Sequence, residues 1–234
     1  MYHSVTLGDK NTWDDWHLIP ASRPLFNPPP VKTNYVDLPG GDGILDLTTA
    51  LTGRPTYNNR TGSWTFYVEN GFRDWSVLYS EIMVYLHGRT MRAILEDDPA
   101  YYYEGRFSVN AWKSDKDRSS IVIDYNVGPY KKDVYGTGDD WLWDPFNFET
   151  GVIKNYKNLA VSGTLSVTVF GDMMESTPII IASASGMRVS FEGESYSLAK
   201  GTNVVKEIIL QSGENVLTFS GNGIVSIENT GGRL

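Results

Sequence analysis

The segment TLSVTVF, residues 164–170, alternates aliphatic and hydroxyl-bearing side chains. Its second, fourth and sixth positions are Leu, Val and Val, whereas its first, third and fifth are Thr, Ser and Thr. A β-strand turns successive side chains to opposite faces, so this order separates the aliphatic groups from the hydroxyls. The segment therefore predicts a strand with one face toward a core and one toward water.

Similar segments follow it at close spacing to the end of the sequence. They are PIIIAS, MRVSFE, ESYSL, VVKEIIL, NVLTFS and IVSIEN, and turns containing glycine, such as SG, GE, KG and GNG, separate them. About seven short strands within roughly 80 residues, joined by turn residues, are typical of an antiparallel β-sandwich. We therefore expect a β-sandwich in this part.

The composition changes near residue 150. All seven tryptophans and ten of the eleven prolines precede it, whereas the remainder is rich in Ser, Gly, Val and Ile. Two core chemistries suggest two domains, residues 1–150, including a connecting segment 134–150, and residues 151–234. The last residues either complete the second domain or return to the first.

Residues 74–88, DWSVLYSEIMVYLHG, predict the one convincing helix of the first domain. Asp74 suits the N-cap and Gly88 suits the C-terminal end. Apolar side chains recur every three or four residues, so they form one stripe that faces a core. The stripe comprises Trp75, Leu78, Ile82 and Leu86, and it is widened by Tyr79 and Met83.

Strand patterns surround this helix. WTFYVEN (residues 64–70) and TMRAIL (residues 90–95) have strand character, and residues 103–127 form a predicted β-hairpin with a charged tip at 113–119. The first domain is therefore expected to be α+β, and the whole protein mostly β.

The segment LPGGDGILDLTTALTG, residues 38–53, is glycine-rich and acidic. A dinucleotide loop needs a third glycine where Asp46 stands, and a phosphate loop needs a lysine that this segment lacks. An EF-hand needs more oxygen ligands than Asp42 and Asp46 supply. PGGDG therefore predicts a tight turn whose glycines supply positive φ, and ILDL predicts a short strand.

The sequence contains no recognisable catalytic or metal-binding constellation. Its histidines, His3, His17 and His87, are far apart in sequence, and no nucleophile elbow is present. Acid pairs at 14/15, 96–98 and 139/140 could serve a glycosidase, but they lie beside aromatics or proline, where turns also favour Asp. We favour a structural role for them, and expect no enzyme activity, cofactor or metal.

Charge and hydropathy exclude further classes. The chain carries a net charge of −8 and no cysteine. Residues 1–150 contribute 14 Lys and Arg against 21 Asp and Glu, a net −7. Such acidity opposes sequence-independent nucleic-acid binding. No stretch approaches the roughly 20 apolar residues of a membrane span, and the N-terminal segment does not have the pattern of a signal peptide.

Aromatic residues cluster in two similar segments, TWDDWHLIP and GDDWLWDPFNF. Their tryptophans could stack on sugars, anchor a protein interface or join two segments in one core. A core or interface role is favoured for these aromatic anchors, which are Trp13, Trp16, Trp141 and Trp143.

Five blocks run in order along nearly the whole sequence. They are WDDWHLIPASRP, PPPVKTNYVDLPGGDGILDLTTALTGRPTYNNRTGSWTFYV, LHGRTMRAILEDDPAYYYEGRFSV, DDWLWDPFNFETGVI and NVLTFSGNGIVSIENTGGRL. In this order they resemble the distal tail (Dit) proteins of long-tailed phages that infect Gram-positive bacteria. The resemblance implies a belt domain related to tail-tube proteins, which lines a channel, and a galectin-like β-sandwich outside it.

The resemblance also implies a function and partners. Such proteins form a homo-hexameric ring at the distal end of the tail, and isolated rings either remain single or pair. The implied neighbours are the tail tube protein, the tail-tip hub (tail-associated) protein and the tape measure protein, with receptor-binding proteins in some phages. DNA passes through without being held, and the ring is assembled in the host cytoplasm as part of the virion.

Three segments are the candidate ring or tail contacts. They are the turn Gly40, Gly41, Asp42 and Gly43, the helix with Asp74, Trp75, Leu78, Ile82 and Leu86, and the hairpin tip with Asp115 and Asp117. The alternative function is a carbohydrate-binding module for host cell-wall glycans. The predicted sandwich argues against it, because Tyr156 and Tyr196 are its only Tyr and it has no Trp to stack on sugars.

Overall fold

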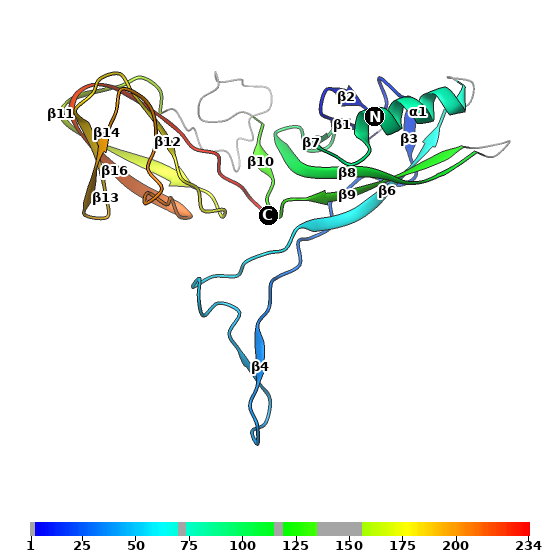
Figure 1. The fold of residues 1–234 in the computed structure, drawn as a ribbon, viewed down its shortest axis with the longest axis horizontal. Coiled ribbons are helices and arrows are strands. Elements are labelled where there is room, and N and C mark those ends of the chain that lie inside the picture. The colour runs from blue at the N-terminus through cyan, green and yellow to red at the C-terminus, as the bar shows by residue number, and fades with distance from the viewer. Residues whose placement is uncertain (1–2, 70–73, 115–118, 135–155) are drawn as a thin grey trace. The chain divides into compact units, whose positions relative to one another are not determined.

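The structure is a computed structural model that describes residues 3–69, 74–114, 119–134 and 156–234 (Figure 1). Two compact units are present: unit 1 comprises Met1–Lys131 with Leu234, and unit 2 comprises Lys132–Arg233. Antiparallel strands make up most of both, so the predicted mostly-β fold is confirmed. The expected domain boundary at residue 150 lies outside the described residues and stays a prediction.

Unit 1 is built on an eight-stranded antiparallel sheet. Its strand order is β2-β1-β7-β8-β9-β6-β3, and β10 pairs with β8 beside this path. The strands are β1 (Val5–Leu7), β2 (Lys10–Asn11), β3 (Leu18–Pro20), β6 (Arg60–Val68), β7 (Arg89–Leu95), β8 (Tyr101–Lys113), β9 (Ser120–Val127) and β10 (Lys132–Asp133), the last of which directly follows the end of unit 1. The predicted hairpin is present as β8 and β9, whose register runs from Gly105 opposite Val127 to Lys113 opposite Ser120.

One helix, α1 (Trp75–Leu86), covers a face of this sheet in the described part of unit 1. The Asp74 side chain caps it by accepting from the Ser76 backbone N–H at 3.1 Å, as predicted. The helix ends because His87 is extended and Gly88 has φ +74°. Fully burying each of its core-facing aliphatic side chains stabilises the fold by about 1.5–3 kcal/mol; these are Leu78, Ile82 and Leu86.

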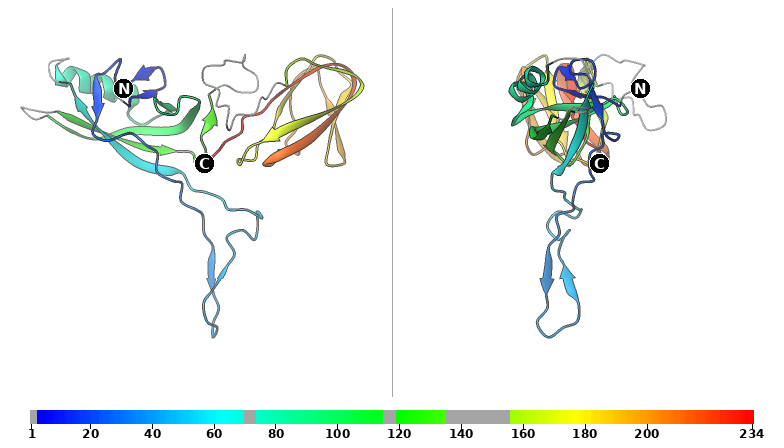
Figure 2. Two further views of the ribbon diagram at one scale, coloured as in Figure 1. Left: turned by 180° about the vertical axis from the view of Figure 1, so that it is seen from behind. Right: turned by 90° about the vertical axis from the view of Figure 1, so that its right-hand side faces the viewer.

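A separate two-stranded ribbon lies between β3 and β6 in the sequence. Its strands, β4 (Tyr35–Asp37) and β5 (Ile44–Asp46), pair with each other and with no other named strand. Nearer the sheet the ribbon is held by the isolated bridge of Val31 with Tyr57. The ribbon and its flanking residues, 28–59, are called the arm below, and they appear in Figures 1 and 2 as a narrow extension of unit 1.

Unit 2 is one six-stranded antiparallel sheet that curls around its own core (Figure 1). The strand order is β14-β13-β16-β12-β15, and β11 pairs with β16. The strands are β11 (Leu159–Gly171), β12 (Ile179–Ala182), β13 (Met187–Phe191), β14 (Glu194–Leu198), β15 (Gly201–Val204) and β16 (Gly213–Glu228). Residues 164–170, which predicted a strand, lie in β11.

Two details of unit 2 differ from the sequence-based expectation. NVLTFS and IVSIEN are not two strands joined by a turn, because β16 continues through Gly221, Asn222 and Gly223 in unbroken register with β11. The glycines allow a bend here instead, since Gly221 has φ +113° and pairs with Gly163 at φ +78°.

The predicted strand VVKEIIL is also wrong over most of its length, because β15 ends at Val204. The chain turns immediately after, with the Ile208 N–H donating to the Val205 carbonyl at 3.1 Å. Ile208 and Leu210 are nevertheless fully buried in the unit 2 core. Their apolar side chains therefore reflect packing in the core and not membership of a strand.

Candidate functional site

The structure brings the histidines and acids into separate structural pairs. Among the described residues, no group of three or more His, Asp or Glu could hold a metal ion. His3 pairs with Asp97 at 2.9 Å and His17 with Glu69 at 2.7 Å, through Nδ1 in each case. Both pairs are partly exposed, and His87 instead accepts from the Val109 N–H. The acids at 139/140 lie outside the described residues.

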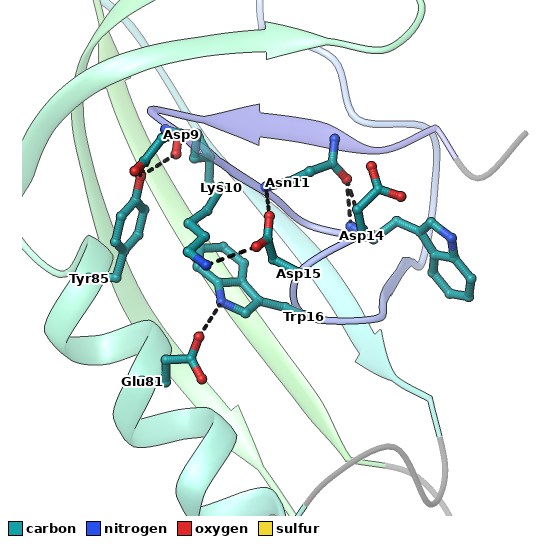
Figure 3. A network of polar contacts seen from close by, with 10 residues as sticks. Asp9, Lys10, Asn11, Asp14, Asp15, Trp16, Glu81 and Tyr85 are labelled. Atoms are coloured by element: carbon teal, nitrogen blue, oxygen red, sulfur yellow. Dashed lines mark hydrogen bonds and ion pairs between the residues drawn. The ribbon is translucent and has the colours of Figure 1, made fainter.

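A polar network ties the β1–β2 hairpin and the turn after it to α1 (Figure 3). Asp15 accepts from Lys10 Nζ and from the Asn11 backbone N–H, both at 2.8 Å. The indole Nε1 of Trp16 donates to Glu81 Oε1 on the helix at 3.3 Å. Asp15 of the acid pair 14/15 thus contributes to a turn and an ion pair, as the structural role that we favoured requires.

Tyr85 links the same helix to the hairpin from the other side. Its hydroxyl accepts from the Asp9 N–H at 3.0 Å, and its single proton lies within hydrogen-bond reach of both the Asp9 carboxylate and the Leu7 carbonyl, the latter at 2.8 Å. Burial raises the pKa of Tyr85, and the hydrogen bond from Tyr85 lowers the pKa of Asp9. The hydrogen bond to Asp15 raises the pKa of Lys10. These shifts stabilise the charged forms of the acid and the lysine, as expected in a network that holds two elements together.

The four predicted aromatic anchors have different surroundings. Trp16 is fully buried in the unit 1 core, with its ring edge-on to Tyr85 at 5.5 Å between centroids. Trp13 is partly exposed and lies against His17 at 4.9 Å. Trp141 and Trp143 lie outside the described residues. The buried Trp16 therefore joins two segments in one core, whereas the partly exposed Trp13 remains accessible at the surface.

The helix residues proposed for ring contacts divide in the same way. Leu78, Ile82 and Leu86 are fully buried, so they are not available to another subunit in this fold. Asp74 is exposed and caps the helix, and Trp75 is partly buried. On the opposite side α1 exposes Val77 and Val84, the latter at 73%. The sequence pattern did not indicate this outward apolar pair, because the periodic stripe on the other side of the helix is stronger.

Trp75 belongs to an aromatic cluster that the sequence pattern did not predict. Its neighbours are Tyr79 on the helix and Trp112 on β8, with Tyr79 and Trp112 centroids 4.8 Å apart. A β-bulge between Val109 and Ala111 inserts an extra residue into β8 and places Trp112 opposite the buried Ile121. The bulge therefore turns Trp112 toward the helix side, where it stays 50% exposed.

The predicted turn Gly40–Gly43 forms the end of the arm. Gly40 and Gly43 have φ +78° and +79°, and the Gly41 N–H donates to the Leu38 carbonyl at 3.1 Å. No atom lies within 4 Å of a Cβ built on Gly40 or Gly43. The glycines are thus required by the backbone conformation and not by close packing, and the tight turn and the following strand, β5, form as predicted. Asp42 is exposed at this turn.

The arm has no core of its own. No residue from 28 to 59 is buried. Its two strands expose side chains of the kind that normally fill a protein interior, and Leu51 is 97% exposed. The large exposed apolar side chains of the arm are Val31, Tyr35, Val36, Leu38, Ile44, Leu45 and Leu51.

One face of the unit 1 sheet is polar. Along β6, β8 and β9 the residues that alternate with the buried ones carry mainly hydroxyl, amide or charged side chains. They line an open hollow on the face opposite the core, and its polar residues are Thr61, Ser63, Arg106, Ser108, Asp124 and Asn126. The predicted hairpin-tip residues Asp115 and Asp117 lie outside the described residues.

Comparisons with known proteins identify the fold. No protein-family model and no curated protein matches the chain. Among solved structures, the chain is similar to the crystal structure of the SPP1 Dit protein (gp 19.1), described as a paradigm of the hub adsorption apparatus in phages that infect Gram-positive bacteria. The TM-score is 0.60 over 100% of both chains, at 10% identity.

At this identity the likeness shows the fold alone. The protein is thus a mostly-β protein with a Dit-like fold, which confirms the fold implied by the resemblance; membership of the family stays a prediction. The only helix of the described residues has 12 residues, too few to cross a membrane.

Proposed function

We propose that the protein is a structural component of a phage tail, in which identical copies form a hexameric ring. The arm is the observation that carries this proposal, because it exposes seven large apolar side chains and buries none. The Dit-like fold supports the same role, since the similar SPP1 protein is described as a hub of the adsorption apparatus.

The ribbon of the arm pairs with no other named strand. A two-stranded ribbon without a further layer is marginally stable in water. The aliphatic side chains of β4 and β5 gain stability only when another surface covers them. A neighbouring copy supplies such a surface in a ring, where each subunit gives its arm to one neighbour and receives the arm of the other. In this arrangement the Gly40–Gly43 turn lies at a subunit contact, as the sequence predicted.

The polar sheet face suits the wall of a channel. Its hydroxyl and amide groups are satisfied by water, and the described charges include both signs, Arg106 and Asp124. Such a wall has no concentrated positive charge that would retain a phosphate backbone. In the proposed ring, DNA passes along this face without specific binding.

The ring joins the tail tube protein to the tail-tip hub protein, next to the tape measure protein and, in some phages, receptor-binding proteins. It therefore belongs to the virion at the distal end of the tail. The described histidines His3 and His17 each pair with one acid, an arrangement that suits a structural role.

Removing the arm tests the ring. Replacing residues 33–55 with Asn-Gly joins Lys32 to Thr56, whose backbones already meet in an N–H to carbonyl hydrogen bond of 2.8 Å. Asn-Gly favours a two-residue hairpin turn. Native mass spectrometry should find six subunits, or twelve in paired rings, for the parent protein and a folded monomer for the variant. A variant that still forms six-membered rings would contradict the role of the arm.

Carbohydrate binding is the second candidate, favoured by the exposed ring of Trp112 beside Trp75 and Tyr79. Stacking of sugars on such rings should be detectable by calorimetry with purified cell-wall glycans. Trp112→Ala should then abolish binding, whereas Trp13→Ala serves as a matched control. A monomeric protein that binds glycans through Trp112 would favour this candidate over the ring.

A further inference from the structure

The long strand β11 of unit 2 has an unpaired side. It pairs with β16 over all 13 of its residues, from Leu159 opposite Val225 to Gly171 opposite Gly213. No other described strand pairs with it. Its opposite edge therefore presents backbone donors and acceptors with no partner strand among the described residues.

A single hydrogen bond identifies the backbone groups that face outward. Phe170 stands opposite Glu214 in the register, yet its N–H donates to the Tyr156 hydroxyl at 3.0 Å. Its backbone thus faces away from β16. Because alternate residues of an antiparallel strand face the same side, the N–H and C=O groups of Thr164, Ser166 and Thr168 also face away.

This edge lacks the devices that usually prevent strands from pairing with other chains. Natural edge strands are short, or they carry charges, proline or bulges. β11 has neither a charged residue nor proline in its 13 residues. The other two outer strands of unit 2 are short: β14 has five residues and carries Glu194, and β15 has four and follows Lys200. Among these three strands, only β11 is both long and free of charged residues.

We propose that this edge pairs antiparallel with the same edge of a second copy, about a two-fold axis through Ser166. The sequence TLSVT is nearly the same in both directions. In this register Thr164 lies opposite Thr168, Leu165 opposite Val167, and Ser166 opposite its equivalent. Hydroxyls meet hydroxyls on one face and aliphatic groups meet aliphatic groups on the other, as favourable cross-strand pairs require.

The structure also limits the length of the pairing. Gly163, with φ +78°, bends β11 at one end, and the Tyr156 hydroxyl occupies the Phe170 N–H at the other. Residues 164–168 lie between these limits, and Ser166 is their midpoint. Thr164, Ser166 and Thr168 are exposed, so their side chains leave the edge open to a second copy.

Such a contact differs from one that closes a ring. A two-fold contact uses one surface on both copies, whereas a cyclic hexamer uses two different surfaces head to tail. Pairing through β11 therefore joins two subunits, or subunits of two rings, and it does not depend on the arm. The inference stands independently of the proposed ring.

Disulfide trapping tests the pairing directly, because the native chain has no cysteine. Hydrogen-bonded residues in facing antiparallel strands have Cα atoms about 5.5 Å apart, within the range for a disulfide. Ser166→Cys should form a covalent dimer under mild oxidation, seen on a non-reducing gel. Val216→Cys is the control, since Val216 is exposed one strand inward, opposite Thr168. Equal dimer yields from both variants would overturn the proposal.

Charge substitutions in the Ser166→Cys background test the register. With Thr164→Lys and Thr168→Lys, lysines face each other twice, and the dimer should weaken roughly tenfold because opposed like charges repel. With Thr164→Glu and Thr168→Lys, each Glu faces a Lys and the dimer yield should be retained. Circular dichroism checks that both variants fold. If the Glu–Lys variant loses cross-linking as fully as the Lys–Lys variant, the Ser166-centred register is wrong.

Discussion

At the residue scale, Gly105 in unit 1 is required by the close approach of a neighbouring backbone. A Cβ built on Gly105 in β8 would lie 2.2 Å from the Asn126 carbonyl oxygen and 2.4 Å from Val127 Cα. These are backbone atoms of the paired strand β9, so they cannot move aside without distorting the hairpin. Gly128, just beyond that strand, has its nearest neighbour at 3.8 Å.

Gly105→Ala should therefore destabilise the protein by about 1–3 kcal/mol or more, as overpacking does. Urea denaturation followed by tryptophan fluorescence measures the change. Gly128→Ala is the matched control and should differ from the parent by less than about 0.5 kcal/mol. Equal stability of the two variants would show that the β8–β9 approach is looser than the structure indicates.

Tyr85 and Asp9 give a prediction about acid stability. The pKa of Asp9 is lowered in the folded protein, chiefly by the hydrogen bond from Tyr85. A lowered pKa contributes stability above the unfolded value, near 3.9, that is lost as pH falls through the folded value. Tyr85→Phe should thus lower the stability at neutral pH, because the Asp9 carboxylate loses this hydrogen bond. The difference from the parent should shrink below about pH 4.

Thermal unfolding between neutral pH and pH 3 checks this dependence. Tyr57→Phe, in the arm, is the control and should shift the melting temperature equally at every pH. If the loss of stability caused by Tyr85→Phe stayed constant down to pH 3, the Tyr85 hydroxyl would not be the cause of the lowered pKa of Asp9.

At the scale of elements, local backbone conformation is enough to form the tip of the arm, whereas its apolar side chains need another surface to become buried. Its tip forms from the positive φ of Gly40 and Gly43, whereas its apolar side chains contribute nothing until they are covered. Leu51 is the most exposed of them, so a change there acts on a partner surface and not on a core.

Leu51→Asp should weaken ring assembly by roughly tenfold, about the value of one buried aliphatic side chain. The melting temperature of the dissociated subunit should stay unchanged, because the side chain has no internal contact to lose. Analytical ultracentrifugation over a concentration series measures the assembly. Thr52→Asp places the same charge one residue away and is the control; if both variants assemble alike, Leu51 is not part of the contact.

The elements also show what sequence patterns convey. The stripe of α1 and the alternation of β11 were predictable because each follows the period of its secondary structure. The bulge between Val109 and Ala111 was not predictable, because an inserted residue does not change the composition of the strand. The position of Trp112, which depends on this bulge, was therefore missed. The exposure of Ile44 and Leu45 was not predictable either, because aliphatic strand residues normally lie in cores. The proposed contacts between copies depend on surfaces of two chains, so no periodic pattern within one sequence could indicate them.

At the scale of the whole molecule, the negative charge is concentrated in one part of the sequence. Most of the net charge, −7 of −8, lies in residues 1–150. On the polar sheet face the described acids include Glu104 and Asp124. If this face lines the channel, its charge sets the electrostatic friction on a passing phosphate backbone.

Glu104→Lys with Asp124→Lys should therefore slow DNA ejection from phage particles carrying the variant, measured by release of a DNA-binding dye. The delay should decrease at high salt, which screens the added charges. Glu194→Lys with Glu214→Lys gives the same charge change in unit 2 and should leave ejection unchanged. Normal ejection from the sheet-face variant would count against a channel wall at this position.

The exposed arm also has a consequence for the lifetime of a free subunit in the cell. An extended segment without buried residues fits readily into a protease active site, and Lys32 offers a cleavage point near its base. Once a neighbour covers the arm, that point is closed. If the proposed ring forms, a subunit whose arm stays uncovered remains open to degradation, and the ring contains only chains whose arms were covered in time.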